Sequence, residues 1–137
     1  MSSILTPVLL LVTWSLLVLG LVAVTRLPTM RRMGLNFQAA RHTADLSVLP
    51  TPIRQISDNY NHLMEQPTIF YALALYTHLA GHADALNVQF AWAYFGLRVV
   101  HSLVQITFNF VPLRFSIFTL GTLVLTIWSV REVVALF

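Results

Sequence analysis

The sequence predicts an all-α integral membrane protein, an antiparallel bundle of four transmembrane helices. Composition is the first observation behind this: of 137 residues, 57% are hydrophobic and 9% are charged, whereas a soluble domain has about 25% charged residues. The second is that apolar stretches of about 20 residues alternate with short polar segments. A mean hydropathy of +0.74 excludes a soluble globular enzyme. A single membrane domain, residues 1–137, accounts for the whole chain.

The first span is predicted over residues 4–25, because this stretch has no charged side chain and is long enough to cross the hydrocarbon core. Pro7 stands in its first turn, where a helix tolerates proline. The stretch has neither a basic start nor a small-residue cleavage site, so we expect a span and not a cleaved signal peptide. Residues 26–52 then form a polar loop, with a short surface helix around 36–43.

The other three spans follow with short connections, which make neighbouring helices antiparallel. A long second helix opens with polar side chains and becomes apolar from Leu63. The third span carries Arg98 and His101 in its interior, and the fourth has Arg114 and Arg131 near its ends. The predicted spans two to four cover residues 56–79, 86–108 and 113–134.

The placement of arginine predicts the orientation, since basic residues concentrate in short cytoplasmic loops. The connection between the second and third spans has no basic residue other than histidine. We therefore expect a cytoplasmic first loop and both termini outside. The net charge of +3 predicts no nucleic-acid partner. The chain has no cysteine, so thiol chemistry would need a thiol from another molecule. The arginines of the first loop are Arg26, Arg31, Arg32 and Arg41.

Ionisable side chains gather in the half of the predicted bundle next to the first loop, where function is expected because such residues avoid lipid. One interpretation is a structural lock in which Glu65 pairs with Arg98. Arginines outnumber carboxylates at this depth, however, which favours an anionic ligand. Helical spacing groups these residues into two polar stripes, one with Asp58, Asn61 or His62, and Glu65, the other with Arg98, His101 or Ser102, and Gln105.

Two histidines near the outer end of the second helix raise a different possibility. His78 and His82 are four residues apart with Asp84 close by, a possible metal geometry. Histidines at the level of the lipid headgroups give the same pattern without a metal. We expect this second case, and no metal site.

Three segments stand out: NHLMEQPTIFY from Asn61 to Tyr71, Arg98-Val99-Val100-His101, and Leu113-Arg114-Phe115. Together they resemble the MAPEG family, the membrane-associated proteins in eicosanoid and glutathione metabolism. The resemblance covers about residues 54–128. The helix-two Glu, the helix-three Arg-x-x-His and the helix-four Arg have the separations found in the microsomal prostaglandin E synthase branch. The motif Glu-x-Pro-x-x-Phe-Tyr is more similar to that of the family's bacterial members.

This resemblance implies a homotrimer in a bacterial inner membrane, with glutathione bound between subunits near the cytoplasmic side. In such proteins the helix-two Glu contacts the amine of glutathione and arginines hold its carboxylates. Arg114 takes the place of the arginine that stabilises the thiolate, and is the predicted catalytic residue. The other predicted site residues are Arg26, Asn61, His62, Glu65, Arg98 and His101.

The implied function is a glutathione-dependent transferase or peroxidase that acts on lipophilic electrophiles, with glutathione or another anionic low-molecular-weight thiol as co-substrate. The chain departs from the family pattern where a family Asn is His62 and a family Arg is Asp58. Two family tyrosines are Gln105 and Phe118. These changes favour the alternative, a non-catalytic trimer that binds a lipid or a membrane partner.

Overall fold

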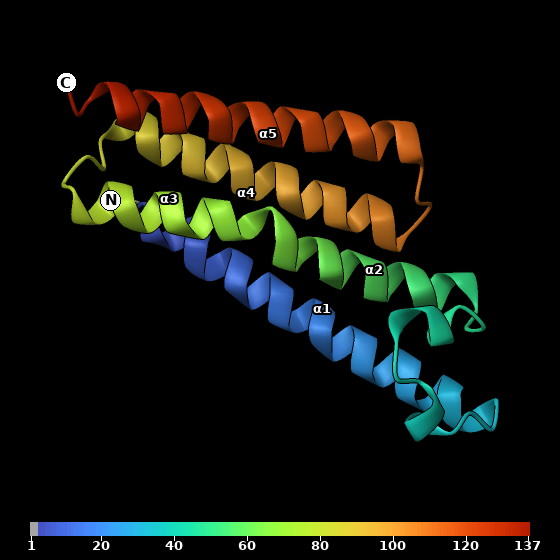
Figure 1. Cartoon of the computed structure of the whole chain (residues 1–137). Coiled ribbons are helices and arrows are strands. Elements are labelled where there is room, and N and C mark those ends of the chain that lie inside the picture. Colours follow the sequence, from blue (N-terminus) through green and yellow to red (C-terminus); the bar gives the residue numbers. More distant parts are fainter. Residues whose placement is uncertain (1–2) are drawn as a thin grey trace.

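The computed structural model describes residues 3–137, which form a bundle of four antiparallel rods (Figure 1). Three rods are single helices, and the second rod consists of two helices in line. The predicted all-helical bundle is confirmed. In chain order, the helices are α1 (Leu5–Arg32), the short 3-10 helices η1 (Phe37–Ala39) and η2 (Thr43–Leu46), α2 (Thr51–Glu65), α3 (Pro67–Leu79), α4 (Ala85–Ile106) and α5 (Val111–Val134).

The first helix is longer than predicted. It continues through Pro28 to Arg32, so seven residues that we expected in the loop are helical. Arg31 and Arg32 lie in its last turn, where positive charge complements the helix dipole. Gly34, with a φ of 66°, then turns the chain out of the helix. The predicted surface helix around 36–43 is replaced by η1 and η2.

The long second helix is interrupted between Glu65 and Pro67. Proline has no N–H to donate and its ring clashes with the carbonyl group four residues earlier, which explains the break at this place. The side chain of Gln66, at the junction, donates to the hydroxyl oxygen of Thr122 and accepts from the hydroxyl group of Tyr94. The break is therefore held against both α4 and α5.

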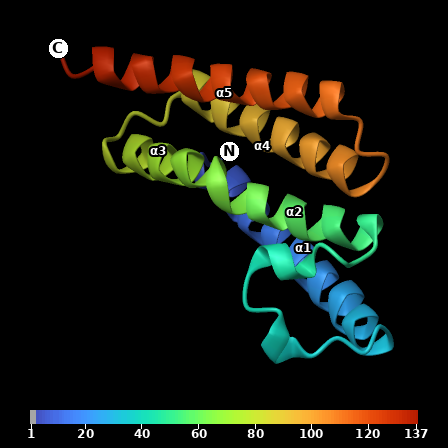
Figure 2. The ribbon, with the colours of Figure 1, turned by 45° about the vertical axis from the view of Figure 1, so that its right-hand side comes forward.

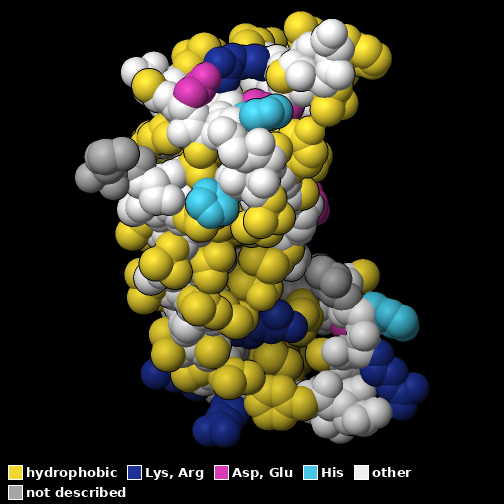
Figure 3. Space-filling model, turned by 90° about the vertical axis from the view of Figure 1, so that its left-hand side faces the viewer, with side chains coloured by type: hydrophobic (Ala, Val, Ile, Leu, Met, Phe, Trp, Pro, Cys, Tyr) yellow, Lys and Arg dark blue, Asp and Glu magenta, His cyan; other side chains and the backbone are white. Residues whose placement is uncertain are grey.

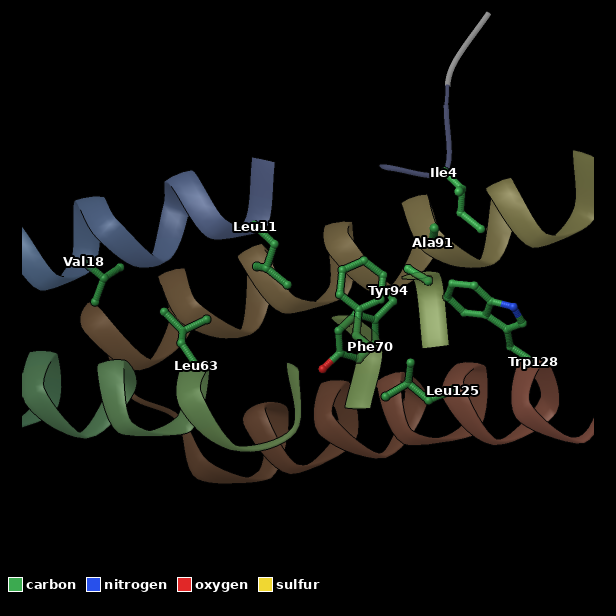
Figure 4. Packing of buried hydrophobic residues seen from close by; sticks show 10 residues of the cluster. Ile4, Leu11, Val18, Leu63, Phe70, Ala91, Tyr94, Leu125 and Trp128 are labelled. Carbon is green, nitrogen blue, oxygen red and sulfur yellow. The ribbon is translucent and has the colours of Figure 1, made fainter. Parts of the chain in front are cut away.

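Aromatic side chains form the centre of the apolar core (Figure 4). The ring of Phe70 stacks on that of Tyr94, with centroids 4.8 Å apart, and meets the edge of Trp128 at 6.2 Å. The indole N–H of Trp128 donates to the hydroxyl oxygen of Thr77 over 3.2 Å. These contacts join α3, α4 and α5. Leu11 and Val18 of α1 complete the cluster from the other side.

The two ends of the bundle differ in what they contain. The connection between α3 and α4 lies at the same end as the C-terminus and the start of α1 (Figure 1). We call this the connection end. The α1–α2 loop and the α4–α5 turn lie at the opposite, loop end, and the loop sits beside α1 and α2 in both views (Figures 1 and 2). This is the arrangement that the predicted orientation requires, although Met1 lies outside the described residues.

Candidate functional site

A polar face of α4 is buried in the loop-end half of the bundle. Apart from the adjacent pair His101 and Ser102, neighbouring members of this face lie three or four residues apart, and each is at most 4% exposed. The face consists of Arg98, His101, Ser102 and Gln105. Side chains at this spacing share one side of a helix. The predicted polar stripe on the third rod is confirmed, and it faces the interior.

The Arg98 side chain donates from Nη2 to the backbone carbonyl oxygen of His62 over 2.6 Å. This oxygen lies in the last turn of α2, which ends at Glu65, and a carbonyl oxygen has two lone pairs, so it can accept from Arg98 in addition to any bond within the helix. The bond links α4 to α2 within the bundle.

The predicted ion pair between Glu65 and Arg98 is not formed within the described residues. The side chain of Glu65 is 70% exposed, and its nearest cationic partner is Nδ1 of His62 at 3.6 Å. Arg98 is buried and uses a carbonyl oxygen in place of the carboxylate. The lock interpretation is therefore wrong in this form, because Glu65 projects from α2 on the outer side of a single chain.

Two histidines and Arg114 complete the group around Arg98. The rings of His62 and His101 meet edge to face with centroids 6.2 Å apart. The positive charges of Arg98 and Arg114 both act on the His101 ring. Arg114 donates from Nη1 to the side-chain oxygen of Asn109, whose φ of 50° marks the turn before α5. We call His62, Glu65, Arg98, His101 and Arg114 the loop-end cluster.

The other two predicted site residues lie elsewhere. Arg26 of α1 and Asn61 of α2 line a separate cavity of about 430 Å³ beneath the α1–α2 loop. Within one chain, the structure thus brings five of the predicted residues together and places two at a neighbouring cavity.

Sequence reasoning missed the polar contacts that join α1, α2 and α4. Asn59 is fully buried and donates to the hydroxyl oxygen of Ser102 over 2.6 Å, and the indole N–H of Trp14 donates to the same oxygen. The available signal was the buried series Ile56, Asn59 and Leu63, whose three- and four-residue steps define the inner face of α2. This face differs from the predicted stripe, which used Asn61 or His62.

Several buried polar atoms of the loop-end half have no hydrogen-bond partner within the described residues. Buried polar groups are normally paired, so an unpaired group calls for a ligand, a water molecule or another chain. The guanidinium atoms among them can only donate, which suits an anionic acceptor. The six atoms are Ser57 Oγ, Asn59 Oδ1, Arg98 Nε, His101 Nδ1, Gln105 Oε1 and Arg114 Nε.

The connection end has its own polar group, and its side chains are paired. Asn87, at the start of α4, donates to the Glu132 carboxylate over 2.7 Å and accepts from Nη1 of Arg131 over 2.6 Å. His82 Nδ1 lies 2.8 Å from the other oxygen of Glu132. Arg131 also donates to Asp84, and this contact lowers the pKa of the Asp84 carboxyl to about 2. These five residues form the connection-end network.

This network bears on the possible metal geometry. The side chains of His82 and Asp84 are directed to Glu132 and Arg131, respectively. Within residues 3–137, no group of three or more His, Cys, Asp or Glu side chains is placed to hold a metal ion. Both side chains join α5 to the α3–α4 connection.

A comparison with known protein families gives one match, to the MAPEG family over residues 4–134. This range includes every helix that positions the loop-end cluster. The chain belongs to the MAPEG family. Searches among curated proteins and among solved structures give no match.

MAPEG proteins are membrane proteins, and the surface of this chain fits that environment. Helices α1 and α5 are each long and apolar enough to cross a bilayer. Hydrophobic side chains cover most of the face in Figure 3, with charged side chains gathered toward its upper and lower edges. Large apolar side chains such as Leu16, Val24 and Phe115 are more than half exposed. The prediction of a MAPEG-like helical membrane protein is confirmed.

Proposed function

We propose that the loop-end cluster binds glutathione, or another anionic low-molecular-weight thiol, as co-substrate of a transferase or peroxidase for lipophilic electrophiles. The observation that supports this is the unsatisfied positive charge. Arg98 Nε and Arg114 Nε are buried without a partner, and within the described residues neither side chain has a carboxylate within 4.0 Å. Arginines of this kind suit the carboxylates and thiolate of such a ligand.

The ligand would lie on the side of the subunit. Inside the bundle, no room for a ligand remains beside Arg98, His101 and Phe118, where the free volume is about 0 Å³. The Glu65 carboxylate, in contrast, is exposed on the outer side of α2. A second subunit against this surface would enclose the ligand and remove Glu65 from lipid, where a charged side chain is costly. We therefore propose a homotrimer, with glutathione between subunits.

Each residue then has a chemical role. Glu65 accepts hydrogen bonds from the ligand's ammonium group, and His62, Arg98 and His101 hold a carboxylate. Arg98 and His101 are buried in the single chain, so their side chains must turn toward the outer side to reach the ligand. Arg26 and Asn61 line a different cavity of their own chain, so we assign their contribution to the ligand of the adjacent subunit. Arg114 lies beside the sulfur, where a cation lowers a thiol pKa from about 8.5 and favours the reactive thiolate.

The reaction differs with the apolar substrate. With an electrophile, the sulfur lone pair forms a carbon–sulfur bond, and a leaving group departs or the carbon skeleton takes up a proton. With a hydroperoxide, the sulfur attacks the outer oxygen, the O–O bond breaks and an alcohol forms. A second thiol then reduces the sulfenic acid, giving a disulfide and water. The bilayer supplies the apolar substrate while water supplies the thiol.

The alternative is a non-catalytic trimer that binds a lipid or a membrane partner. Gln105 lies where the family resemblance expects a tyrosine, and its Oε1 is buried without a partner in the described residues. Phe118, at the second tyrosine position, offers no hydroxyl group to a thiol. The change to Phe118 removes a hydroxyl donor from the thiol site, and the change to Gln105 replaces a phenol with an amide; both favour this second function.

The orientation is also a proposal: a multi-pass protein of a bacterial inner membrane with the α1–α2 loop in the cytoplasm. It places the loop-end cluster on the side where soluble thiols are abundant. The chain lacks cysteine, so single cysteines introduced at positions 40 and 83 would show on which side of the membrane each position lies. They should react with a membrane-impermeant reagent from opposite sides, and labelling from one side only would refute the orientation.

Glutathione binding to the detergent-purified protein, measured by calorimetry, tests the proposed function. We expect Arg98→Ala to weaken binding about 10- to 100-fold, as expected when a charge-assisted hydrogen bond worth roughly 1.5–3 kcal/mol is lost. Arg31→Ala removes an equal charge from the exposed end of α1 and should leave binding unchanged. Equal losses in the two variants would show that only net charge matters.

A further inference from the structure

The cavity beneath the α1–α2 loop is a second place on this chain that is suited to an anion. Its volume of about 430 Å³ lies within the usual range for small-molecule sites, about 300–1,000 Å³. Residues of α1, the loop and α2 form its walls, and Figure 2 shows the loop beside both helices. Its charged lining residues other than histidine are Arg26, Arg41, Arg54 and Asp58.

These three arginines have few partners. Arg54 donates from Nη1 to the carbonyl oxygen of Ser47, and Arg41 from Nε to that of Gln38, both over a long 3.4 Å. In the part of the chain that the structure describes, none of the three lies within 4.0 Å of a carboxylate. Three guanidinium groups against one carboxylate leave the cavity with net positive charge, which an anion would balance.

An apolar groove of about 250 Å³ adjoins the cavity along α1. It shares Val22, Arg26 and Ala40 with the cavity. Elsewhere its lining is apolar, and Leu19 and Leu27 are 40% and 45% exposed. A basic cavity that continues into an apolar groove has the chemistry of a site for an anion with a hydrocarbon chain.

The depth of the cavity in the bilayer indicates which anion. Arg26 follows the first helical residue, Leu5, by 21 residues, which corresponds to about 32 Å at a rise of roughly 1.5 Å per residue. The hydrocarbon core is about 30 Å thick. A span that begins at Leu5 therefore brings Arg26 and the cavity to the level of the lipid phosphates, with the groove beside the acyl chains.

We propose that this cavity and groove bind one anionic glycerophospholipid of the surrounding bilayer. The phosphate lies among Arg26, Arg41 and Arg54, and one acyl chain lies along the groove on α1. Basic pockets at this level of membrane proteins recognise anionic headgroups in this way. A soluble anion would use the cavity alone, and the adjoining groove favours the lipid. The cavity is separate from the loop-end cluster of its own chain, but its lining residues Arg26 and Asn61 are shared with the glutathione site proposed for the adjacent subunit. The tests therefore use Arg41 and Arg54, which have no role in that glutathione site.

Lipid binding to the full-length, delipidated protein, followed by native mass spectrometry, tests this proposal. Phosphatidylglycerol should bind more tightly than phosphatidylcholine of the same chain length. The double variant Arg41→Gln/Arg54→Gln should weaken phosphatidylglycerol binding about tenfold. The matched control Arg31→Gln/Arg32→Gln removes the same charge from the exposed last turn of α1 and should have no such effect.

A second variant tests the groove and does not change the charge. Ala23 is exposed on α1 and lines the groove, so Ala23→Trp should weaken phosphatidylglycerol binding and leave glycerol 3-phosphate binding unaltered. The proposal is overturned if the two lipids bind equally, or if the control pair loses as much binding as Arg41→Gln/Arg54→Gln. It is equally overturned if glycerol 3-phosphate binds as tightly as the lipid, which would identify a site for a soluble anion.

Discussion

The two ends of the bundle treat their polar side chains differently. At the connection end, Asn87, Glu132 and Arg131 satisfy one another through short hydrogen bonds. At the loop end, Arg98 and Arg114 each keep a buried Nε without a partner in the described residues. Both ends contain arginine, so composition does not explain the difference. The ends differ in whether their buried polar side chains are hydrogen-bonded. Paired side chains indicate a structural role, and unpaired side chains indicate a binding role.

Residues of the same type should therefore respond differently to substitution at the two ends of the bundle. Removing a member of a satisfied network leaves its partners buried and unpaired, which costs stability. Removing a group that is itself poorly satisfied costs the fold little, because its desolvation was never fully compensated. The loop end should therefore lose ligand binding on mutation, and the connection end should lose stability.

The largest effect on stability is expected for Asn87→Ala. Asn87 is fully buried, and its side chain contacts His82, Glu132 and Arg131. The substitution should lower the free energy of unfolding by about 3 kcal/mol, since it leaves a buried carboxylate short of a donor. Denaturant titration in detergent micelles, followed by tryptophan fluorescence, measures this change.

The matched control is Asn61→Ala at the loop end. Asn61 is exposed, and surface substitutions typically change stability by no more than about 0.5 kcal/mol. Comparable losses in the two alanine variants would refute the distinction between the ends.

A smaller effect is expected when Arg98 is replaced by methionine, an apolar side chain of similar length. Arg98 donates to one carbonyl oxygen, and its Nε is unpaired. Arg98→Met should change the free energy of unfolding by less than about 1 kcal/mol, while glutathione binding weakens about 10- to 100-fold, as in Arg98→Ala. A fall of 3 kcal/mol or more in the same titration would make Arg98 a structural residue.

The smallest effect concerns pH and the exposed pair of Asp84 with Arg131. The contact lowers the pKa of Asp84 from 3.8 to about 2, so its stabilisation is present above about pH 4 and is lost as the pH falls toward 2. Half of the Asp84 side chain is exposed, which makes the contribution small. Melting temperatures between pH 2 and pH 6 should show this loss.

Asp84→Asn provides the control for the pH series. The asparagine oxygen can still accept from the backbone N–H of residue 87 as a helix cap, but the charge is gone. The variant should therefore lack the component of the pH dependence that the carboxylate contributes. Identical curves of melting temperature against pH for the two proteins would exclude Asp84 as the source of the pH dependence.

The fold was predictable to the extent that it depends on hydrophobic length and helical spacing. The four rods and the buried face of Arg98, His101 and Gln105 follow from these patterns. The break at Pro67 was not predicted, although proline at this place is visible in the sequence, because membrane helices can also contain proline without ending there. The bond from Arg98 to the carbonyl oxygen of His62, which replaces the expected pair with Glu65, depends on tertiary geometry.

The candidate site was predictable in its residue types but not in its connections. Spacing alone could not choose between the inner and outer faces of α2, so Asn59 was missed and Glu65 was expected inside. Which polar groups remain unpaired depends on atomic distances, and no sequence pattern reports them. The connection-end network was invisible for the same reason, since Glu132 lies 50 residues from His82.

The central claim is that the unpaired guanidinium groups of the loop-end cluster hold an anionic thiol, with Arg114 beside the sulfur. Its most direct test is the ultraviolet absorbance of thiolate when glutathione is added to the purified protein at neutral pH, with S-methylglutathione as the ligand that cannot ionise. We predict that the absorbance appears with glutathione only. Arg114→Ala should abolish the absorbance and leave most of the binding, whereas Arg131→Ala at the connection end should leave it unaltered. Glutathione that binds without ionising would contradict the enzymatic function and leave the binding function, and failure of any thiol to bind would contradict the claim as a whole.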